Sequence, residues 1–214
     1  MGENMKRWHK YEHYLLKGDW HVHTNYTDGK STIFEYCEQA EKNGLELIAF
    51  TEHVRRNLDY DFDDFVAEVY SAKDKFDLEI LAGCEAKVLD SEGTLDVSDD
   101  ILKECEVVLG VFHRFEPIEK KAYLIALKNM LSNPDVDIWA HPTLFAKKKN
   151  KFTLSTKDIR DISTLSLKYN VLIEKNMKYN VPDGLFLEIA SKAGCKFVNG
   201  SDAHQVSELL KLER

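Results

Sequence analysis

Short apolar runs alternate with longer amphipathic stretches along most of this chain. Seven apolar runs, many of their residues β-branched, recur about every 30 residues, at 18–21, 45–53, 78–85, 107–113, 136–141, 170–176 and 195–204. Runs of this length and composition are typical of buried strands, and the stretches between them have the amphipathic character of helices. The alternation predicts βαβ units and a parallel sheet of seven strands.

Three of the predicted helices have recognisable ends. The first begins after Thr32, which forms a capping box with Glu35, and it ends at the Asn43-Gly44 pair. A second runs over 155–169 and a third over 182–193, and each is followed by a residue suited to left-handed backbone, Asn170 and Gly194 respectively. A chain built in this way closes into a barrel or stays an open doubly wound sheet, and periodicity does not choose between them.

The alternation occupies residues 18–214, so we expect one domain there, preceded by an N-terminal extension at 1–17. His9 and His13 lie in the extension at helical spacing and are predicted to be surface residues. No linker interrupts the domain. Residues 146–151, with the sequence AKKKNK, form the only dense charge run and are predicted to be a solvated loop.

Composition narrows the choice of partners. The 37 acidic and 29 basic residues give a net charge of -8, which argues against a broad nucleic-acid surface but leaves local phosphate binding open. The four scattered cysteines are expected to be reduced, buried thiols of an intracellular protein. The first residues lack an apolar targeting region, and no apolar run reaches the length of about 18 residues that spans a membrane. The sequence therefore predicts a cytoplasmic protein without a membrane partner, and it leaves the oligomeric state open.

Metal-binding residue types stand at the ends of six of the seven predicted strands. His21 and His23 are two apart at the first end, and residues at this spacing in a strand point to the same face. In chain order the side chains at these ends are His21, His23, His53, Glu85, His113, His141, Asp202 and His204. The sixth strand contains Glu174 and Asn176, which could hydrogen-bond to the ligands without binding a metal themselves.

In a barrel, all of these ends would meet at one mouth. Imidazoles and carboxylates gathered there are costly to bury without a cation, because like charges repel and burial disfavours ionised groups. Imidazole and carboxylate ligands without thiolate suit Zn, Mn or Fe. Since the ligands are too many for one ion, the sequence predicts two or three divalent transition metal ions, which lower the pKa of bound water.

Six segments carry a family resemblance. DWHVHTNYTDG, IAFTEH, AGCEAK, GVFH, IWAHP and NGSDAH resemble the successive motifs of the PHP (polymerase and histidinol phosphatase) family of metal-dependent phosphoesterases. The resemblance spans roughly residues 18–206 in the family's order. It implies a distorted seven-stranded (β/α)7 barrel similar to a TIM barrel, with a site that is usually trinuclear. The implied function is that of a phosphomonoesterase or phosphodiesterase, which hydrolyses a small phosphorylated substrate through a metal-activated hydroxide.

The resemblance also implies roles for individual residues. His21, His23, Glu85 and Asp202 would hold one metal, Glu85 would bridge to a second held by His113 and His141, and Asp28, His53 and His204 would hold a third. Asp28 stands where family members carry Asp or His, although an Asp-Gly pair is also common in turns. Besides Glu85 at the metals, Asp202 or His204 is expected to protonate the leaving alkoxide.

Phosphate binding requires positively charged side chains beside the metals. Arg55 and Arg114 lie close to His53 and His113 in sequence, and an arginine fork binds phosphate oxygens bidentately. Lys87 follows Glu85 by two residues and is a further candidate, as are Lys147 to Lys149. Each of these side chains has an alternative interpretation as a surface ion pair or a solvated cation.

Three alternatives stay open at this stage. The substrate could be histidinol phosphate, but family members with that activity are typically longer, and this chain ends about ten residues after its last motif. An amidohydrolase also begins with His-x-His after a first barrel strand, and it often carries a bridging lysine where this chain has Glu85. A metal-bound PHP module without catalysis usually lacks ligands, and none is missing here. Nucleic acid is expected only as a short substrate.

Overall fold

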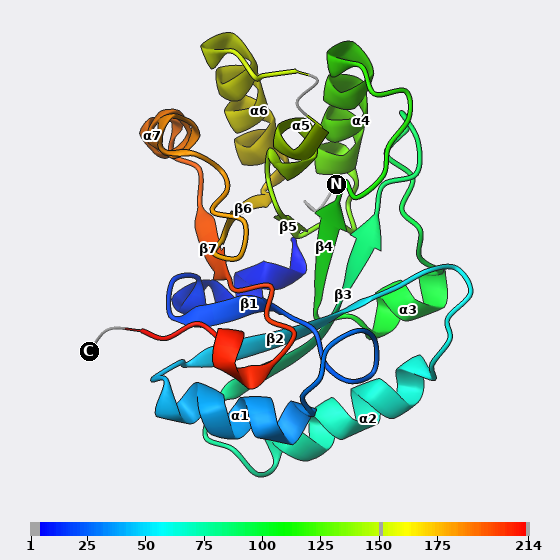
Figure 1. Ribbon diagram of the computed structural model, residues 1–214, viewed down its shortest axis with the longest axis vertical. Coiled ribbons are helices and arrows are strands. Elements are labelled where there is room, and N and C mark those ends of the chain that lie inside the picture. Colours follow the sequence, from blue (N-terminus) through cyan, green and yellow to red (C-terminus); the bar gives the residue numbers. More distant parts are fainter. Residues whose placement is uncertain (1–4, 150–151, 213–214) are drawn as a thin grey trace.

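The computed structural model describes residues 5–149 and 152–212, in which seven parallel strands form one sheet. Their order in the sheet is their order in the chain: β1 (Gly18–Val22), β2 (Leu47–His53), β3 (Glu79–Lys87), β4 (Val107–Val111), β5 (Ile138–Trp139), β6 (Leu172–Asn176) and β7 (Phe197–Gly200). The sheet curls so that its two edges meet (Figure 1). The predicted seven-stranded parallel sheet is thereby confirmed.

Backbone contacts near the ends of β1 and β7 bring the two edge strands together. Val22 forms a parallel bridge with Ala203, and the amide of Asp202 donates to the carbonyl of His21 at 2.8 Å. The result is a nearly closed barrel, which decides between the two architectures that periodicity left open. Closure matters for the site because it gathers the carboxyl ends of all seven strands around one mouth.

In the described residues, seven α-helices cover the outside of the barrel. They are α1 (Ile33–Lys42), α2 (Phe62–Lys73), α3 (Asp99–Glu104), α4 (Lys120–Ser132), α5 (Leu144–Lys149), α6 (Thr156–Tyr169) and α7 (Gly184–Ala193). Alternate strand residues divide the apolar core into two layers: Ile48 and Phe50 of β2 pack outward toward the helices, whereas Leu47 and Ala49 face the barrel interior. No helix in the described ranges is long and apolar enough to cross a membrane.

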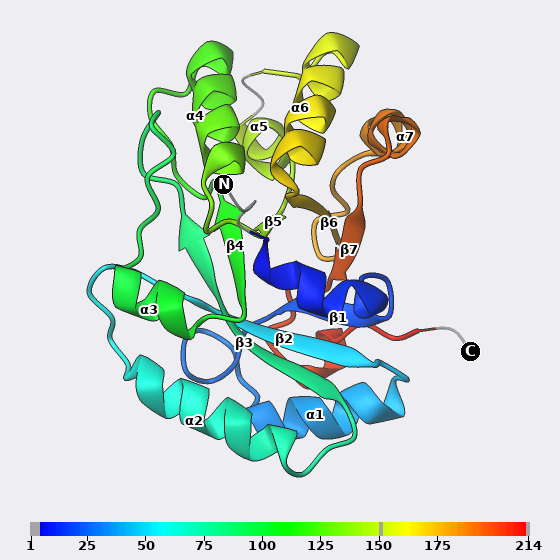
Figure 2. The ribbon, with the colours of Figure 1, turned by 180° about the vertical axis from the view of Figure 1, so that it is seen from behind.

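The N-terminal segment is part of the barrel rather than an appendage to it. A short 3-10 helix, η1 (Arg7–Tyr14), lies across the end of the barrel opposite the mouth, in front of the strands in Figure 2. Trp8 belongs to the interior apolar layer, and its indole N–H donates to the carbonyl of Asn170 at 2.7 Å. Lys6 donates to backbone carbonyls around Val136. Residues 6–14 therefore close the floor of the barrel.

The histidines of this segment agree with their prediction as surface residues only in part. His13 is exposed, but His9 is half-buried and its ring stacks on Trp8 at 3.8 Å. The four cysteines are free and buried, as expected.

Most predicted helix ends are confirmed. Thr32 and Glu35 form the capping box of α1, and Asn170 ends α6 in left-handed backbone with a φ of 53°. The predicted start of the last helix at Pro182 is wrong by two residues, because Asp183 is the N-cap and accepts a hydrogen bond from the amide of Phe186. Residues 146–149 were expected to be a loop but belong to α5, since Leu, Ala and Lys are good helix formers; residues 150–151 lie outside the described ranges.

Five strands are shorter than predicted, β2, β4 and β6 by two residues each and β5 and β7 by more. The fifth was expected over 136–141 and the seventh over 195–204, but β5 ends at Trp139 and β7 at Gly200. His141 and Asp202 have positive φ angles of 34° and 55°, and left-handed backbone does not continue a strand. Both residues are thus turned out of the sheet at the barrel mouth.

Candidate metal centre

The side chains predicted at the strand ends converge at the mouth of the barrel. His53, the last residue of β2, pairs in register with Glu85 of β3, so the sheet itself places the two side by side. His21 lies in β1, and the other members follow strand ends: His23 after β1, His113 after β4, His141 after β5, and Asp202 and His204 after β7. The predicted gathering of these residues at one site is therefore present in the fold.

Glu85 is the centre of the cluster. Its carboxylate is fully buried, and one oxygen, Oε1, lies 2.8 Å from His141 Nε2 and 3.4 Å from the Nε2 atoms of His21 and His113. The other oxygen faces His53. Burial alone would raise the pKa of Glu85, but the histidines around it, His141 foremost, hold that pKa well below its ordinary value. An ionised carboxylate is thus surrounded by four imidazoles.

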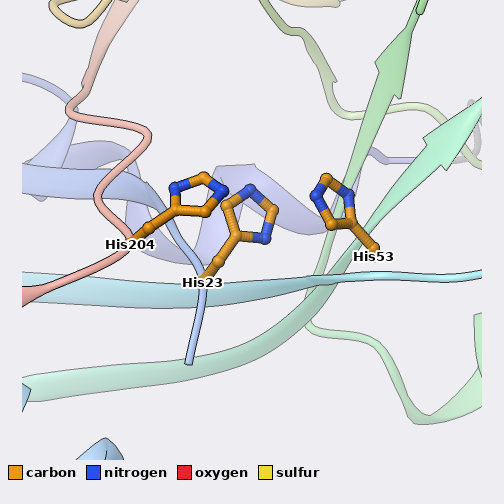
Figure 3. Close-up of side chains that lie close together, drawn as sticks. All are labelled: His23, His53 and His204. Atoms are coloured by element: carbon orange, nitrogen blue, oxygen red, sulfur yellow. The ribbon is translucent and has the colours of Figure 1, made fainter. Parts of the chain in front are cut away.

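Four sets of ligand atoms lie close enough together to hold a metal ion, with all atoms of a set within 4.8 Å of one another. They are His21, His23 and Glu85; Glu85, His113 and His141; His21, His141 and Asp202; and His23, His53 and His204. Figure 3 shows the last set, in which three imidazoles from three separate segments approach each other. The first two sets lie within the ligand groups that the family resemblance implies.

Several polar atoms of the cluster are buried without a hydrogen-bond partner among the described residues. These atoms are both carboxylate oxygens of Glu85 and the Nδ1 atoms of His23 and His53. His53 Nδ1 and Glu85 Oε2 are close in space but lack hydrogen-bond geometry. Since unpartnered buried polar atoms are rare in folded proteins, this donor set fits bound cations. Its chemistry, imidazole and carboxylate without thiolate, fits Zn, Mn or Fe.

The charges around the cluster also favour cations. His23 is buried beside His53, and burial together with this neighbour holds the pKa of His23 well below its ordinary value. A neutral imidazole is the form that binds a metal. At His21 burial acts in the same direction, but the carboxylates of Glu174 and Asp202 outweigh it and raise the pKa well above the ordinary value. The carboxylates around the His21 ring therefore stabilise positive charge at that position.

Glu174, in β6, orients two of the histidines. Its Oε1 lies 2.7 Å from His21 Nδ1, and its Oε2 accepts a hydrogen bond from the backbone amide of His141. Asn176 donates to Glu174 Oε2 at 3.3 Å. A carboxylate on one ring nitrogen of a histidine directs the other nitrogen toward a metal, so the predicted supporting role of Glu174 and Asn176 agrees with these contacts.

Gly200, in β7, makes room for this arrangement. A Cβ atom at position 200 would lie 2.0 Å from Glu174 Oε1 and 3.0 Å from His21 Cβ. Both distances are shorter than van der Waals contact, so only glycine allows Glu174 to approach His21 from this side.

Asp28 lies at the edge of the cluster. Its carboxylate, whose side chain is 58% exposed, is 3.4 Å from His53 Nε2 and 3.3 Å from His204 Nε2. The amide of the next residue, Gly29, donates to the carbonyl of Thr24, so Asp28 also belongs to a turn. The turn and the proximity to two histidines coexist, and the ligand role of Asp28 stays a prediction.

The cluster lines a cavity of about 270 Å³ at the barrel mouth. Of the predicted phosphate-binding residues, Arg55 is part of its wall, but one guanidinium nitrogen of Arg55 donates to the carbonyl of Val54 at 2.6 Å. Lys87 lies 3.6 Å from Asp96, and Arg114 is exposed; neither is among the described residues of the wall. The phosphate-binding roles of these three residues stay predictions.

Three other residues of the wall carry groups that bind anions. Lys148 comes from α5, while Lys178 and Tyr179 come from the loop after β6. Lys148 was predicted only as part of the run 147–149, and Lys178 and Tyr179 were not predicted. Lys178 and Tyr179 follow Asn176 at the end of β6, so extending the strand-end rule by three residues would have found them.

The sequence of this chain is similar to those of known proteins. The sequence profile of the PHP domain family matches residues 19–192. A protein named "Probable phosphatase" from Thermoanaerobacter sp. (strain X514) is 31% identical over 195 residues, covering 87% of this chain and 78% of that protein. The "DNA polymerase/3'-5' exonuclease PolX" of Bacillus subtilis (strain 168) is 30% identical over 207 residues, covering 91% of this chain but 35% of that protein. This chain thus spans about a third of the length of PolX.

Solved structures with the same fold are more distant in sequence. A proposed histidinol phosphatase from Listeria monocytogenes has a TM-score of 0.72 at 17% identity, covering 90% of this chain and 97% of that one. The histidinol phosphate phosphatase of Lactococcus lactis, solved with zinc, L-histidinol and phosphate, has a TM-score of 0.62, also at 17% identity, covering 89% of this chain and 87% of that one. These similarities confirm the barrel fold.

Proposed function

This chain belongs to the PHP domain family, and we propose that it hydrolyses the phosphate ester bond of a small phosphorylated substrate at a site for two or three divalent transition metal ions. The observation that carries this proposal is the buried carboxylate of Glu85, which faces four imidazoles while both of its oxygens lack hydrogen bonds among the described residues. Such a carboxylate suits a bridge between cations. The named phosphatase among its relatives supports the same class of reaction.

The proposed ligands follow from the geometry together with the family. His21, His23, Glu85 and Asp202 would hold one cation; Glu85, His113 and His141 a second; and Asp28, His53 and His204 a third. Divalent cations at such a site supply Lewis-acid stabilisation of phosphoryl oxygens and generate a nucleophile from water at neutral pH. Glu174 would hold His21 in the orientation that this binding needs.

A group at the cavity wall must also protonate the leaving alkoxide. Asp202 and His204 both line the cavity, but the side chain of Asp202 is 5% exposed and that of His204 is 21% exposed. His204 is therefore more accessible to the leaving oxygen of a bound substrate, and it can act as this acid only if its Nε2 atom binds no cation. Its Nδ1 lies 2.9 Å from the carbonyl of Asp202, which orients the ring.

Elemental analysis of the purified protein, joined to a phosphoester panel, tests the proposal. The panel contains histidinol phosphate, nucleotides and short oligonucleotides, and each is measured with Zn, Mn or Fe and again with a chelator. We expect bound transition metal and a chelator-sensitive hydrolysis of at least one phosphoester. Protein that binds the metal yet hydrolyses none of the panel contradicts the proposal.

The Glu85→Gln variant supplies a matched test of the central observation. The amide keeps the shape of the side chain but removes the charge and half of the acceptor capacity. We expect loss of bound metal together with a fall in activity of at least about 100-fold, because changing a residue that merely orients a ligand already costs about 10- to 100-fold. Unchanged metal content and activity would show that Glu85 is not a ligand.

A further inference from the structure

A lysine, a tyrosine and a second lysine form one side of the cavity at the barrel mouth. The ammonium of Lys148 lies 4.2 Å from the centre of the Tyr179 ring, and that of Lys178 lies 5.8 Å from the same centre. Tyr179 stands edge-on to the ring of His141 at 5.9 Å, so this group directly adjoins the metal cluster. Two lysines and a tyrosine therefore line the same cavity as the predicted metal ligands.

Lys148 differs in its surroundings from the other basic residues near the mouth. Arg55 and Lys87 lie 4.0 and 3.6 Å from the carboxylate of Asp96, so both cations are paired with a negative charge. Within the described ranges, by contrast, Lys148 forms no ion pair with a carboxylate, and it is exposed. Lys148 is thus charged, accessible and uncompensated by any described carboxylate.

Lys178 occupies the edge between this group and the metal cluster. Its ammonium lies 3.4 Å from Asp202 Oδ1 and 3.0 Å from His204 Nδ1. It is one-third exposed, so it can reach a ligand in the cavity without leaving Asp202. Lys178 therefore lies between the proposed ligands Asp202 and His204 on one side and Tyr179 on the other.

We propose that Lys148, Tyr179 and Lys178 form an anion clamp that selects the terminal, dianionic phosphate of a monoester over the internal phosphate of a diester. The proposal rests on the proposed phosphoesterase function and names its substrate class. A monoester has a third unesterified oxygen beyond those that reach the metals, and this oxygen carries charge that two ammonium groups and a phenol O–H can bind. In a diester that oxygen carries a second organic group, which is uncharged and would occupy the space between the lysines.

The neighbouring Lys147 provides a matched control on the same helix. The sequence made Lys147 a phosphate-binding candidate too, but Lys147 is not among the described residues of the wall at the mouth. It lines a different cavity, of about 460 Å³, which is bordered by α5, α6 and α7. Lys147→Gln and Lys148→Gln remove the same charge from adjacent positions, so general electrostatic attraction would weaken equally in both. The Lys178→Gln variant is the second probe, and its metal content is measured because Lys178 contacts Asp202 and His204.

Two measurements on the metal-loaded protein test the clamp. The first is the affinity for inorganic phosphate, by titration calorimetry. We expect Lys148→Gln to raise the Kd about tenfold, the loss typical of one charge-assisted hydrogen bond, and Lys147→Gln to leave it within about twofold. The second is the ratio of kcat/KM for p-nitrophenyl phosphate to kcat/KM for bis(p-nitrophenyl) phosphate. This ratio should fall about tenfold in Lys148→Gln and stay unchanged in Lys147→Gln. It should also fall about tenfold in Lys178→Gln, provided that this variant keeps its metal.

The clamp is refuted if Lys147→Gln and Lys148→Gln weaken phosphate binding equally, or if both esters lose activity in equal proportion. Hydrolysis of neither ester by the wild-type protein would count against the proposed function. Phosphate affinity would then still test the clamp, because it needs no turnover. The two failures are therefore distinguishable.

Discussion

At the scale of single residues, the metal centre depends on side chains that bind no metal themselves. Glu174 fixes His21 through Nδ1 and holds the backbone of His141, while Gly200 leaves the space that Glu174 occupies. The positive φ angles of His141 and Asp202 turn both side chains out of their strands and into the mouth. Strained backbone of this kind is typical of functional sites, where the surrounding structure maintains it.

The Gly200→Ala substitution tests this support. The added methyl group would overlap Glu174 Oε1, so Glu174 must move and His21 loses its partner. We expect metal affinity to fall about 10- to 100-fold, as measured by competition with a chelator of known affinity. Gly184→Ala is the control, because a Cβ atom at position 184 meets nothing within 4 Å. Equal affinities of the two variants would rule out the proposed role of Glu174.

Asp28 allows a separate test of the third metal position. The Asp28→Ala variant should lose one metal equivalent in elemental analysis and keep the others, because Asp28 approaches only His53 and His204 within the cluster. Asp77→Ala, an exposed change before β3, should keep the full metal content. If Asp28→Ala also keeps it, Asp28 is a turn residue and not a ligand.

At the scale of elements, η1 is the segment whose role changes most between sequence and structure. It seals the floor of the barrel through Trp8, while Arg7 contacts the carboxylate of Asp137, the residue before β5. These contacts reach residues more than 100 positions away in the chain. The segment before β1 is therefore a structural part of the barrel.

Removal of the Trp8 side chain should destabilise the whole fold. Trp8 is 2% exposed within the interior layer, so Trp8→Ala leaves a cavity there, and we expect a loss of about 3 to 5 kcal/mol in the free energy of unfolding. Urea denaturation of this variant and of His13→Ala, an exposed change on the same element, measures the difference. A loss below about 1 kcal/mol in Trp8→Ala would show that η1 is peripheral to stability.

Asp137, between η1 and β5, should make the free energy of unfolding depend on pH. Burial raises the pKa of Asp137 to about 6, and the cations of Arg7 and Lys6 oppose this only in part. Because the folded protein holds this proton more tightly than the unfolded chain, whose Asp pKa is about 3.9, the contribution to stability is greatest below pH 4 and falls as the pH rises to about 6. The free energy of unfolding of wild type minus that of Asp137→Asn should thus decrease by about 2 kcal/mol from pH 4 to pH 7.

Denaturant titrations of both proteins at several pH values provide this comparison. The subtraction cancels the titration of the metal centre, which the two proteins share. A difference that increases with pH would mean that the ion pair with Arg7 outweighs burial and that the pKa of Asp137 is lowered.

At the scale of the whole molecule, two apolar layers build the barrel and the metal centre lies at one end of it. The interior and exterior layers together include side chains from all seven strands. Since this core does not involve the cluster, metal binding should add to stability without being needed for folding, unlike the case of small zinc domains.

Removal of the metals tests this division between core and site. We expect a chelator to lower the Tm and abolish phosphoester hydrolysis, while the far-ultraviolet circular dichroism at 25 °C stays that of the folded barrel. Added metal should restore both the Tm and the activity. Loss of the dichroism signal on chelation would show instead that the barrel needs its metals to fold.

The sequence by itself determined the seven strands, most helix ends and the set of strand-end side chains that meet at the mouth. These features depend on local periodicity, on capping side chains such as Thr32, and on the rule that parallel strands present their carboxyl ends together. Closure of the barrel, the floor made by Trp8, the early ends of β5 and β7, and the positions of Lys148 and Lys178 were decided only by the tertiary structure. Each depends on contacts between distant segments, as Trp8 and Asn170 illustrate, and local patterns carry no information about which distant residues will meet.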